Sequence, residues 1–272
     1  MTQDANPTTA SDGDEDPERR PQSQSTPQKS ARPGKPAQVK KPEKNLYQPY
    51  DTPIIAWNAI RVVARFLFLI LLDVRVLGRK NLPAKGPFII ASNHLSWTDI
   101  PLIPAYLPYK VVAMAKEETF QSNIAWLVRF MGGFPVRRGE GDRQAIRAAE
   151  EQLKQGKVLF MFPEGTRSKT RTLAKGHAGL GMIALRAGVP VVPTAVWGSE
   201  HVLKKFRPRV TIAFGPPMIL KPEGAKITRE DINESTEQVM RSIASMLPPA
   251  YRGVYGEQEY PQQGENEPTS LL

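Results

Sequence analysis

Beyond residue 74, short apolar runs alternate with stretches of helical pattern. Apolar runs of strand length occur at 88–91, 111–115, 158–162, 189–196 and 210–214. Strands that are buried on both faces and separated by helices form largely parallel sheets with right-handed crossovers. We therefore predict an α/β fold with a mostly parallel central sheet that is flanked by helices.

Two of the intervening helices carry clear signals at their ends. Asp142 is a typical N-cap for a helix over 142–155. Thr228 and Asp231 are spaced as a capping box that opens a helix over 228–247. Neither a G-x-G-x-x-G nor a Walker loop occurs between these elements, which argues against the nucleotide-binding members of this fold class.

The ends of the chain differ in composition from the predicted domain. Residues 1–50 contain eight prolines and almost no aliphatic residues, with an acidic block followed by a basic one. Residues 253–272 contain four glutamates and neither lysine nor arginine. Segments of this kind cannot bury a hydrophobic core. We predict a disordered, charge-segregated arm over 1–50, a disordered acidic tail over 253–272 and an α/β domain over 74–252.

The net charge of +10 is concentrated in the central part of the chain. The arm contributes +1 and the tail −4, which leaves +13 for residues 51–252. Such a surplus favours anionic partners: an acidic membrane surface, phosphorylated small molecules or nucleic acid. Nucleic acid is the weakest of these, because no basic platform with interleaved aromatic residues and no recognition helix is visible. The chain has no cysteine, which excludes disulfides, thiolate metal sites and a cysteine nucleophile.

The first apolar segment, 54–72, is long enough to span a bilayer, but it contains Asn58, Arg61 and Arg65 on one helical face. Two arginines near the middle of a span would cost about 2.5–3.5 kcal/mol each. A helix in the membrane interface avoids this cost by keeping its arginines among the headgroups. The residues then expected to face the acyl chains are Trp57, Ile60, Val63, Ala64, Leu67 and Leu71. We predict an interfacial helix over 51–73, with a spanning helix and a buried core helix as open alternatives.

Polar residues follow the first strand run, in the order Ser92-Asn93-His94-Leu95-Ser96-Trp97-Thr98-Asp99. His94 and Asp99 would point apart on a regular helix or strand, so they meet only across a turn. Across such a turn, Asp99 fixes the tautomer of the imidazole and leaves its second nitrogen as a general base. A purely structural histidine is the alternative. Ser96 lacks the tight elbow that exposes a serine nucleophile, so the base would serve a hydroxyl group of the substrate.

Two further segments supply glycine and arginine at turns. Residues 132–139 read GGFPVRRG, and residues 162–168 read FPEGTRS directly after a strand run. The planar guanidinium of arginine suits phosphate, and glycine lets the backbone approach a ligand closely. The alternative is a pair of ordinary surface turns in which Glu164 and Arg167 form an ion pair. The remaining histidines lack a nearby carboxylate motif and are predicted to be surface or structural residues.

Taken together and in this order, these segments resemble the four motifs of the glycerolipid acyltransferase family. The motifs are Asn93-His94-x-Ser96-x-x-Asp99, Gly133 to Arg138, Phe162-Pro163-Glu164-Gly165-Thr166-Arg167-Ser168 and Val189-Pro190-x-x-Pro193. The likeness covers roughly residues 75–220 and is greatest for bacterial 1-acyl-glycerol-3-phosphate acyltransferases. Where the family commonly has an aspartate before the second-motif arginine, this chain has Arg137, so Arg138 is the better match.

The resemblance implies transfer of a fatty acyl group from acyl-CoA or acyl carrier protein to the 2-hydroxyl of 1-acyl-glycerol 3-phosphate, which gives phosphatidic acid. It implies that His94 is the base and that Asp99 orients it. The residues implied to hold the phosphate-bearing acceptor are Arg138, Glu164, Gly165, Thr166 and Arg167. The Val-Pro segment is implied to line the acyl or acceptor pocket.

The resemblance further implies no metal ion or bound cofactor, membrane lipids as partners, and a peripheral or monotopic position on the cytoplasmic face of the cell membrane. Two alternatives stay open. The acceptor could be glycerol 3-phosphate or another lysophospholipid or lipid. The chain could also be a non-catalytic protein that binds membranes or anions.

Overall fold

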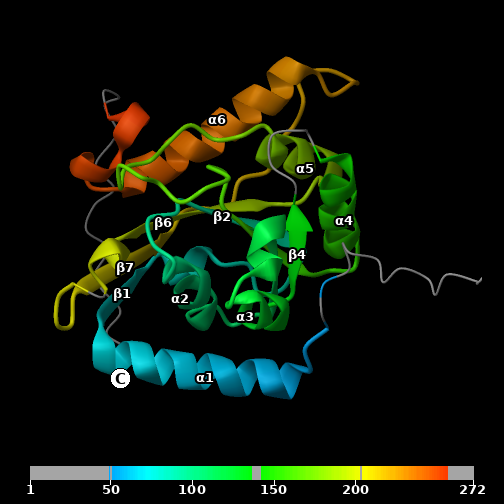
Figure 1. Ribbon diagram of the computed structural model, residues 1–272. Helices are drawn as coiled ribbons and strands as arrows, with labels where there is room; N and C mark the ends of the chain where they lie inside the picture. Colours follow the sequence, from blue (N-terminus) through cyan, green and yellow to red (C-terminus); the bar gives the residue numbers. More distant parts are fainter. Residues whose placement is uncertain (1–48, 50, 137–141, 203, 257–272) are drawn as a thin grey trace, which may run out of the picture. The chain divides into compact units, whose positions relative to one another are not determined.

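A seven-stranded sheet lies at the centre of the computed structural model (Figure 1). The structure describes residues 49, 51–136, 142–202 and 204–256, all within one unit, Glu43–Leu272. The predicted arm falls outside the described residues apart from position 49, and the predicted tail falls outside them beyond position 256.

The α-helices are α1 (Ile54–Leu71), α2 (Asp99–Ala105), α3 (Ala125–Phe130), α4 (Arg143–Lys154), α5 (Gly179–Ala187) and α6 (Arg229–Met246). The strands are β1 (Asp73–Leu77), β2 (Phe88–Ser92), β3 (Val111–Lys116), β4 (Gly133–Val136), β5 (Val158–Met161), β6 (Val191–Trp197) and β7 (Arg209–Phe214). Short 3-10 helices are η1 (Arg79–Asn81), η2 (Glu117–Gln121), η3 (Ser199–His201), η4 (Pro249–Tyr251) and η5 (Gly253–Tyr255).

The strands lie in the order β1-β7-β6-β2-β5-β3-β4. All neighbouring strands are parallel except β6 and β7, so β1 and β7 run opposite to the other five. Helices α4, α5 and α6 cover one face of the sheet, and α1, α2 and α3 cover the other (Figure 1). The predicted fold, a mostly parallel sheet flanked by helices, is confirmed.

Each face of the sheet has its own hydrophobic core. Successive residues of a strand point to opposite faces, so Ile89 and Ala91 of β2 pack under α4 to α6, whereas Phe88 and Ile90 pack under α1 to α3. All four side chains are fully buried. Burial on both faces is the physical reason why the central strands read as continuous apolar runs.

Both predicted helix starts are present. The side chain of Asp142 accepts hydrogen bonds from the backbone N–H groups of Gln144 and Ala145 at the start of α4. Thr228 and Asp231 form a reciprocal capping box at the start of α6. Side chains that satisfy these free N–H groups fix where each helix begins.

The sequence prediction missed two strands, β1 and β4. Strand β1 reads DVRVL and contains two charged residues, and β4 reads GFPV and contains glycine and proline. Both lie at the edges of the sheet, where polar residues and proline are tolerated because one side of the strand has no partner. The segment 132–139, expected to be a turn, therefore contains a strand.

Helix α1 forms where the sequence predicts an interfacial helix, but its inner face differs from the prediction. Trp57 is only 4% exposed, and Ala64 packs against the core beneath α1 to α3. Their expected position toward the acyl chains is therefore wrong. The helix rests on α2 through a stripe at 57, 61, 64 and 68, and apolar periodicity alone did not single out this face.

The arginines of α1 also face the protein rather than the solvent side. Arg61 donates a hydrogen bond to the carbonyl of Leu107 at 2.6 Å, and Arg65 lies over the ring of Tyr106. The end of a helix leaves carbonyl groups without helical partners, and here the arginines of α1 reach the end of α2. The prediction that both arginines would face the headgroups is wrong for this reason.

The outer face of α1 is apolar and exposed. Its exposed large side chains are Ile54, Ile55, Ile60, Val62, Val63, Phe66, Leu67, Leu69, Ile70 and Leu71. Within the described residues, α1 is the one helix whose length and composition would allow it to cross a membrane. One side of α1 thus packs on the protein, and the other side exposes a continuous apolar surface.

The ordered chain continues past the predicted boundary at residue 252. Residues Gly253–Tyr255 form η5, and Tyr255 is buried. The hydroxyl of Tyr255 donates a hydrogen bond to the carboxylate of Glu237 in α6. Residues 253–256 thus belong to the folded domain rather than to the predicted tail.

Candidate active site

Two loops that carry predicted motifs, those after β2 and β5, meet at one edge of the sheet. Strands β2, β5 and β6 are adjacent and parallel, so their carboxyl ends lie side by side. In α/β folds this edge is the usual place for a site. The backbone N–H of Ser168, in the loop after β5, donates to the carbonyl of His94, in the loop after β2, at 2.8 Å.

His94 and Asp99 meet across the turn between β2 and α2. The distance from His94 Nδ1 to Asp99 Oδ2 is 3.0 Å. The same oxygen accepts the backbone N–H groups of Leu95 and Ser96, each at 2.7 Å. The predicted contact between the two side chains is therefore confirmed, and the two backbone bonds hold the carboxylate in place.

This contact defines what the imidazole can do. Because Asp99 accepts at Nδ1, the proton sits on Nδ1 and Nε2 keeps its lone pair. Among the described residues, Nε2 has no hydrogen-bond partner. The ring stacks on Phe162, with 3.9 Å between ring centroids and 13° between planes. His94 is 6% exposed, so a rigid, nearly buried imidazole presents one basic nitrogen.

Glu164 lies beneath the histidine rather than at the surface. It is 2% exposed, and its two oxygens accept the backbone N–H groups of His94 at 2.8 Å and Ala174 at 3.0 Å. Burial raises the pKa of Glu164 to about 7; the two backbone bonds oppose this shift, and the charge of Asp99 adds to it. Both oxygens thus already accept backbone hydrogen bonds. The sequence instead predicts that Glu164 contacts the substrate that receives the acyl group.

Asn93 fastens the turn that carries His94 to the neighbouring strand β6. Its side-chain amide donates to the carbonyl of Val196 at 2.8 Å and accepts the N–H of Val196 at 2.7 Å. The sequence prediction gave no role to Asn93 or to Phe162, although both stand inside the motifs. Their position next to His94 and at the start of FPEGTRS was the available signal.

Three further predicted acceptor residues, Gly165, Thr166 and Arg167, lie in the loop after β5. Thr166 and Arg167 are exposed, and the guanidinium carbon of Arg167 lies 4.9 Å from the ring centroid of Trp97. Gly165 has φ of 65°, and an added Cβ there would come within 2.8 Å of the ring of His177. Glycine is thus needed at this position. Arg138 lies outside the described residues.

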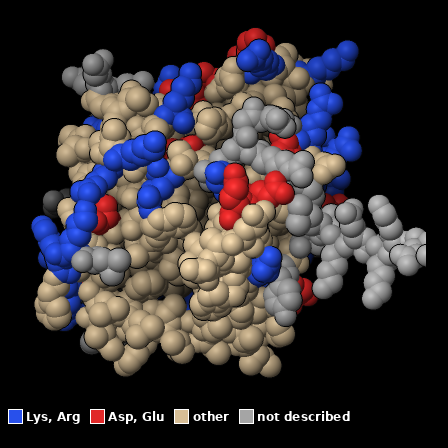
Figure 2. All heavy atoms as spheres, viewed as in Figure 1, with Lys and Arg blue, Asp and Glu red and all other residues tan. Residues whose placement is uncertain are grey.

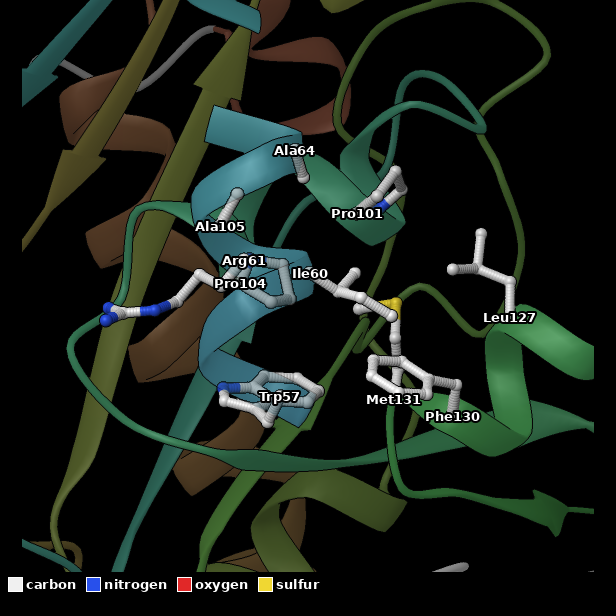
Figure 3. Close-up of a pocket in the computed structure, with 10 residues that line it drawn as sticks. All are labelled: Trp57, Ile60, Arg61, Ala64, Pro101, Pro104, Ala105, Leu127, Phe130 and Met131. Atoms are coloured by element: carbon white, nitrogen blue, oxygen red, sulfur yellow. The ribbon is translucent and has the colours of Figure 1, made fainter. Parts of the chain in front are cut away.

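The Val-Pro segment, 189–193, leads into the start of β6 and does not line the apolar cavity between α1, α2 and α3. Val191, Val192 and Pro193 are buried in the sheet. A cavity of about 70 Å³ lies instead between α1, α2 and α3 (Figure 3). Its lining residues are Trp57, Ile60, Arg61, Ala64, Pro101, Pro104, Ala105, Leu127, Phe130 and Met131. The guanidinium of Arg61 points away from the apolar lining, so the cavity itself is apolar.

Comparison with known proteins identifies the family. A family model described as Acyltransferase matches residues 73–197. A 1-acyl-sn-glycerol-3-phosphate acyltransferase of Bacillus subtilis is 33% identical over 178 residues, which cover 64% of this chain and 87% of that protein. The chain belongs to the acyltransferase family. It is thus an enzyme of acyl transfer, and the resemblance predicted from the four motifs is confirmed.

Two further relatives bear on this acyltransferase. A lyso-ornithine lipid O-acyltransferase of Pseudomonas aeruginosa is 36% identical over 149 residues, covering 54% of this chain and 55% of that protein. The crystal structure of a 1-acyl-sn-glycerophosphate (LPA) acyltransferase from Thermotoga maritima matches with a TM-score of 0.55 and 32% identity. That match covers 68% of this chain and 76% of the other, so the acyltransferase fold extends over most of the described domain.

Proposed function

We propose that this acyltransferase moves a fatty acyl group from a thioester donor to the 2-hydroxyl of 1-acyl-glycerol 3-phosphate, giving phosphatidic acid. The observation that carries the proposal is the geometry of His94, whose Nδ1 is held 3.0 Å from Asp99 while Nε2 is left for the substrate. The names of the Bacillus and Thermotoga relatives support this choice of acceptor.

The proposed chemistry needs no nucleophile from the enzyme. Nε2 of His94 removes the proton of the acceptor hydroxyl as its oxygen attacks the thioester carbonyl. The new carbon–oxygen bond forms, the carbon–sulfur bond breaks, and the thiol leaves with the proton from the imidazolium. Asp99 stabilises the imidazolium and keeps its ring in place. Two further parts of the proposal, that no metal ion or cofactor takes part and that the donor is acyl-CoA or acyl carrier protein, come from the family resemblance.

The loop after β5 is the proposed site for the phosphate of the acceptor. Arg167 offers a planar fork of donors, and its contact with Trp97 limits the orientations that the guanidinium can take. Gly165 and Thr166 would add close backbone and hydroxyl contacts, and Arg138 a second cation. Each of these roles is a proposal that rests on position in the motif and on charge.

Glu164 has a different proposed role from its neighbours in the motif. A carboxylate would repel a phosphate, and both oxygens of Glu164 already accept backbone N–H groups. We propose that Glu164 is a positioning residue that joins the loop after β5 to the backbone of His94. Its effect on catalysis would pass through the placement of the imidazole.

The apolar surfaces of the domain suit a lipid substrate. We propose that the cavity between α1, α2 and α3 receives part of an acyl chain, because its lining is apolar. The exposed outer face of α1 would rest in the membrane, which also supplies the lysolipid acceptor. A position at the cytoplasmic face of the cell membrane is a further proposal, which the family resemblance supports.

A second acceptor is favoured by one comparison. The Pseudomonas relative acts by its name on lyso-ornithine lipid, and it is 36% identical over the matched segment. An ornithine headgroup carries no phosphate, so the Arg167 loop would then have no phosphate to bind. This difference separates the two acceptors experimentally.

The test is an acceptor panel with one acyl-CoA and mass detection of the product. Lysophosphatidic acid, glycerol 3-phosphate and lyso-ornithine lipid are offered separately, and free thiol is measured in parallel. We expect phosphatidic acid and thiol release only with lysophosphatidic acid. Faster product formation with either other acceptor would contradict the proposed acceptor, and thioester hydrolysis without any acyl product would contradict the mechanism.

A further inference from the structure

A loop between η3 and β7 exposes an aromatic side chain among cations. Phe206 is 94% exposed, which is more than any other large apolar side chain in the described part of the chain. Its neighbours in sequence are Lys204, Lys205 and Arg207. A side chain this exposed adds little to the packing of the described residues.

The loop is held next to the end of α1. A guanidinium nitrogen of Arg207 donates to the carbonyl of Leu69 at 3.4 Å. Figure 1 shows the loop projecting beside the C-terminal end of α1. The last turns of that helix expose Phe66, Leu69 and Ile70, so Phe206 extends an apolar surface that already exists.

The same loop lies close to the catalytic edge of the sheet. Strand β7 runs opposite to β6, so β7 begins where β6 ends, at the edge that carries His94. The hydroxyl of Thr98, in the catalytic turn, donates to the carbonyl of Ser199 in η3 at 3.4 Å. Helix η3 leads directly into the loop. The loop therefore lies between the catalytic turn and the end of α1.

The cations of the loop lie close to few carboxylates in the described part of the chain, although the hydrogen bond from Arg209 and the charge of Arg207 both help to lower the pKa of Asp73. Among the described residues, Lys204, Lys205 and Arg207 form no ion pair with a carboxylate; the nearby Asp73 pairs with Arg209 at 2.8 Å. Figure 2 shows Lys and Arg side chains along the left edge of the molecule, where the loop lies, whereas the surface over α1 is largely without charge. A row of cations beside an apolar surface is complementary to a lipid leaflet with anionic headgroups.

We propose that residues 204–207 form a second membrane contact, in which Phe206 enters the interfacial region of an anionic leaflet and the three cations bind lipid phosphates. With α1, this contact brings the catalytic edge to the leaflet that contains the acceptor, so the inference builds on the proposed function. An acidic carrier protein would also match the cations. The exposed Phe206 and its continuity with the outer face of α1 favour the bilayer.

The test measures binding of the full chain to vesicles of phosphatidylcholine with and without phosphatidylglycerol. Each surface lysine contributes a factor of about five to binding an anionic leaflet, so Lys204→Ala/Lys205→Ala should weaken binding to phosphatidylglycerol vesicles by about 25-fold and leave binding to pure phosphatidylcholine unchanged. Phe206→Ser should weaken binding to both. The matched controls are Lys221→Ala/Lys226→Ala and Ile219→Ser, which are exposed changes between β7 and α6 and should have no effect.

The outcomes separate the competing explanations. Thermal unfolding of the loop variants should match that of the parent, because the changed side chains are exposed. Loop variants that bind vesicles as well as the parent would overturn the proposal. Normal vesicle binding with a selective loss of activity toward acyl carrier protein donors would identify a donor-docking site instead. The binding assay needs no turnover, so failure of the proposed function would appear separately, as absent acyl transfer by the parent.

Discussion

Glu164→Gln tests the buried carboxyl group that accepts the backbone N–H of His94. The change keeps the size of the side chain and removes its ionisation. Burial raises the pKa of Glu164 from 4.5 to about 7, so the folded state favours the protonated form. The resulting stabilisation is fully present below pH 4.5 and is lost as the pH rises through 7. A shift of this size corresponds to about 3 kcal/mol in the free energy of unfolding.

Glutamine also changes the hydrogen bonds. Its single carbonyl oxygen can accept from either His94 or Ala174, whereas Glu164 accepts from both. One buried N–H group is left without an acceptor, which costs about 1–3 kcal/mol at every pH. The variant should therefore be less stable than the parent near pH 4.5, and this difference should shrink by about 3 kcal/mol by pH 8. Its kcat should fall about 10-fold or more, because the imidazole is displaced, while the acceptor KM changes little.

The assay is urea unfolding in detergent from pH 4.5 to 8, followed by tryptophan fluorescence, for parent and variant. Asp231→Asn is a control, because the pKa of Asp231 is shifted in the opposite direction to that of Glu164. Backbone N–H groups of Glu223 and Thr228 hold the pKa of Asp231 below its usual range, so its contribution is present at neutral pH and is lost as the pH falls. A difference between Glu164→Gln and the parent that does not vary with pH would refute the reasoning.

Three further changes address other parts of the site. Arg167→Ala should raise the acceptor KM at least about 10-fold with little change in kcat, since one charge-assisted phosphate contact is lost; an unchanged KM in steady-state kinetics would contradict the phosphate role. Asn93→Ala removes two buried hydrogen bonds to Val196 and should lower the free energy of unfolding by about 2–3 kcal/mol, measured by urea titration, together with a lower kcat. Trp57→Ala should lower the free energy of unfolding by about 3–5 kcal/mol in the same titration, because this side chain of α1 is buried against the domain. A loss below about 0.5 kcal/mol, as for a surface residue, would show that α1 does not pack as described.

The sequence predicts the helix starts, the central strands and the turn after β2, because each depends on residues that are close together along the chain. Asp142 and the pair Thr228 and Asp231 satisfy free N–H groups within a few residues, so the helix starts could be read directly. The central strands are buried on both faces and appear as apolar runs. The turn that joins His94 to Asp99 was also predictable, because no regular element of that length brings the two side chains together.

Contacts between distant segments were not visible in the same way. The sequence placed Arg61 toward lipid headgroups, since nothing local shows that the carbonyl of Leu107 lies within its reach. Glu164 was placed with the phosphate-binding residues because it stands in their motif. Its true neighbours, the N–H groups of His94 and Ala174, lie 70 and 10 residues away along the chain. Edge strand β4 contains glycine and proline, so its own sequence does not indicate a strand. It belongs to the sheet because it pairs with β3.

The most direct test of acyl transfer with His94 as the base is phosphatidic acid formation by His94→Ala, measured by product mass with acyl-CoA and lysophosphatidic acid at saturating concentrations. The far-ultraviolet circular dichroism should match that of the parent, and Asp99→Asn should show an intermediate rate, because it keeps the ring but loses the acceptor that fixes its tautomer. We predict that His94→Ala lowers kcat at least about 100-fold. A folded His94→Ala variant whose kcat stays within a few-fold of the parent would contradict the mechanism.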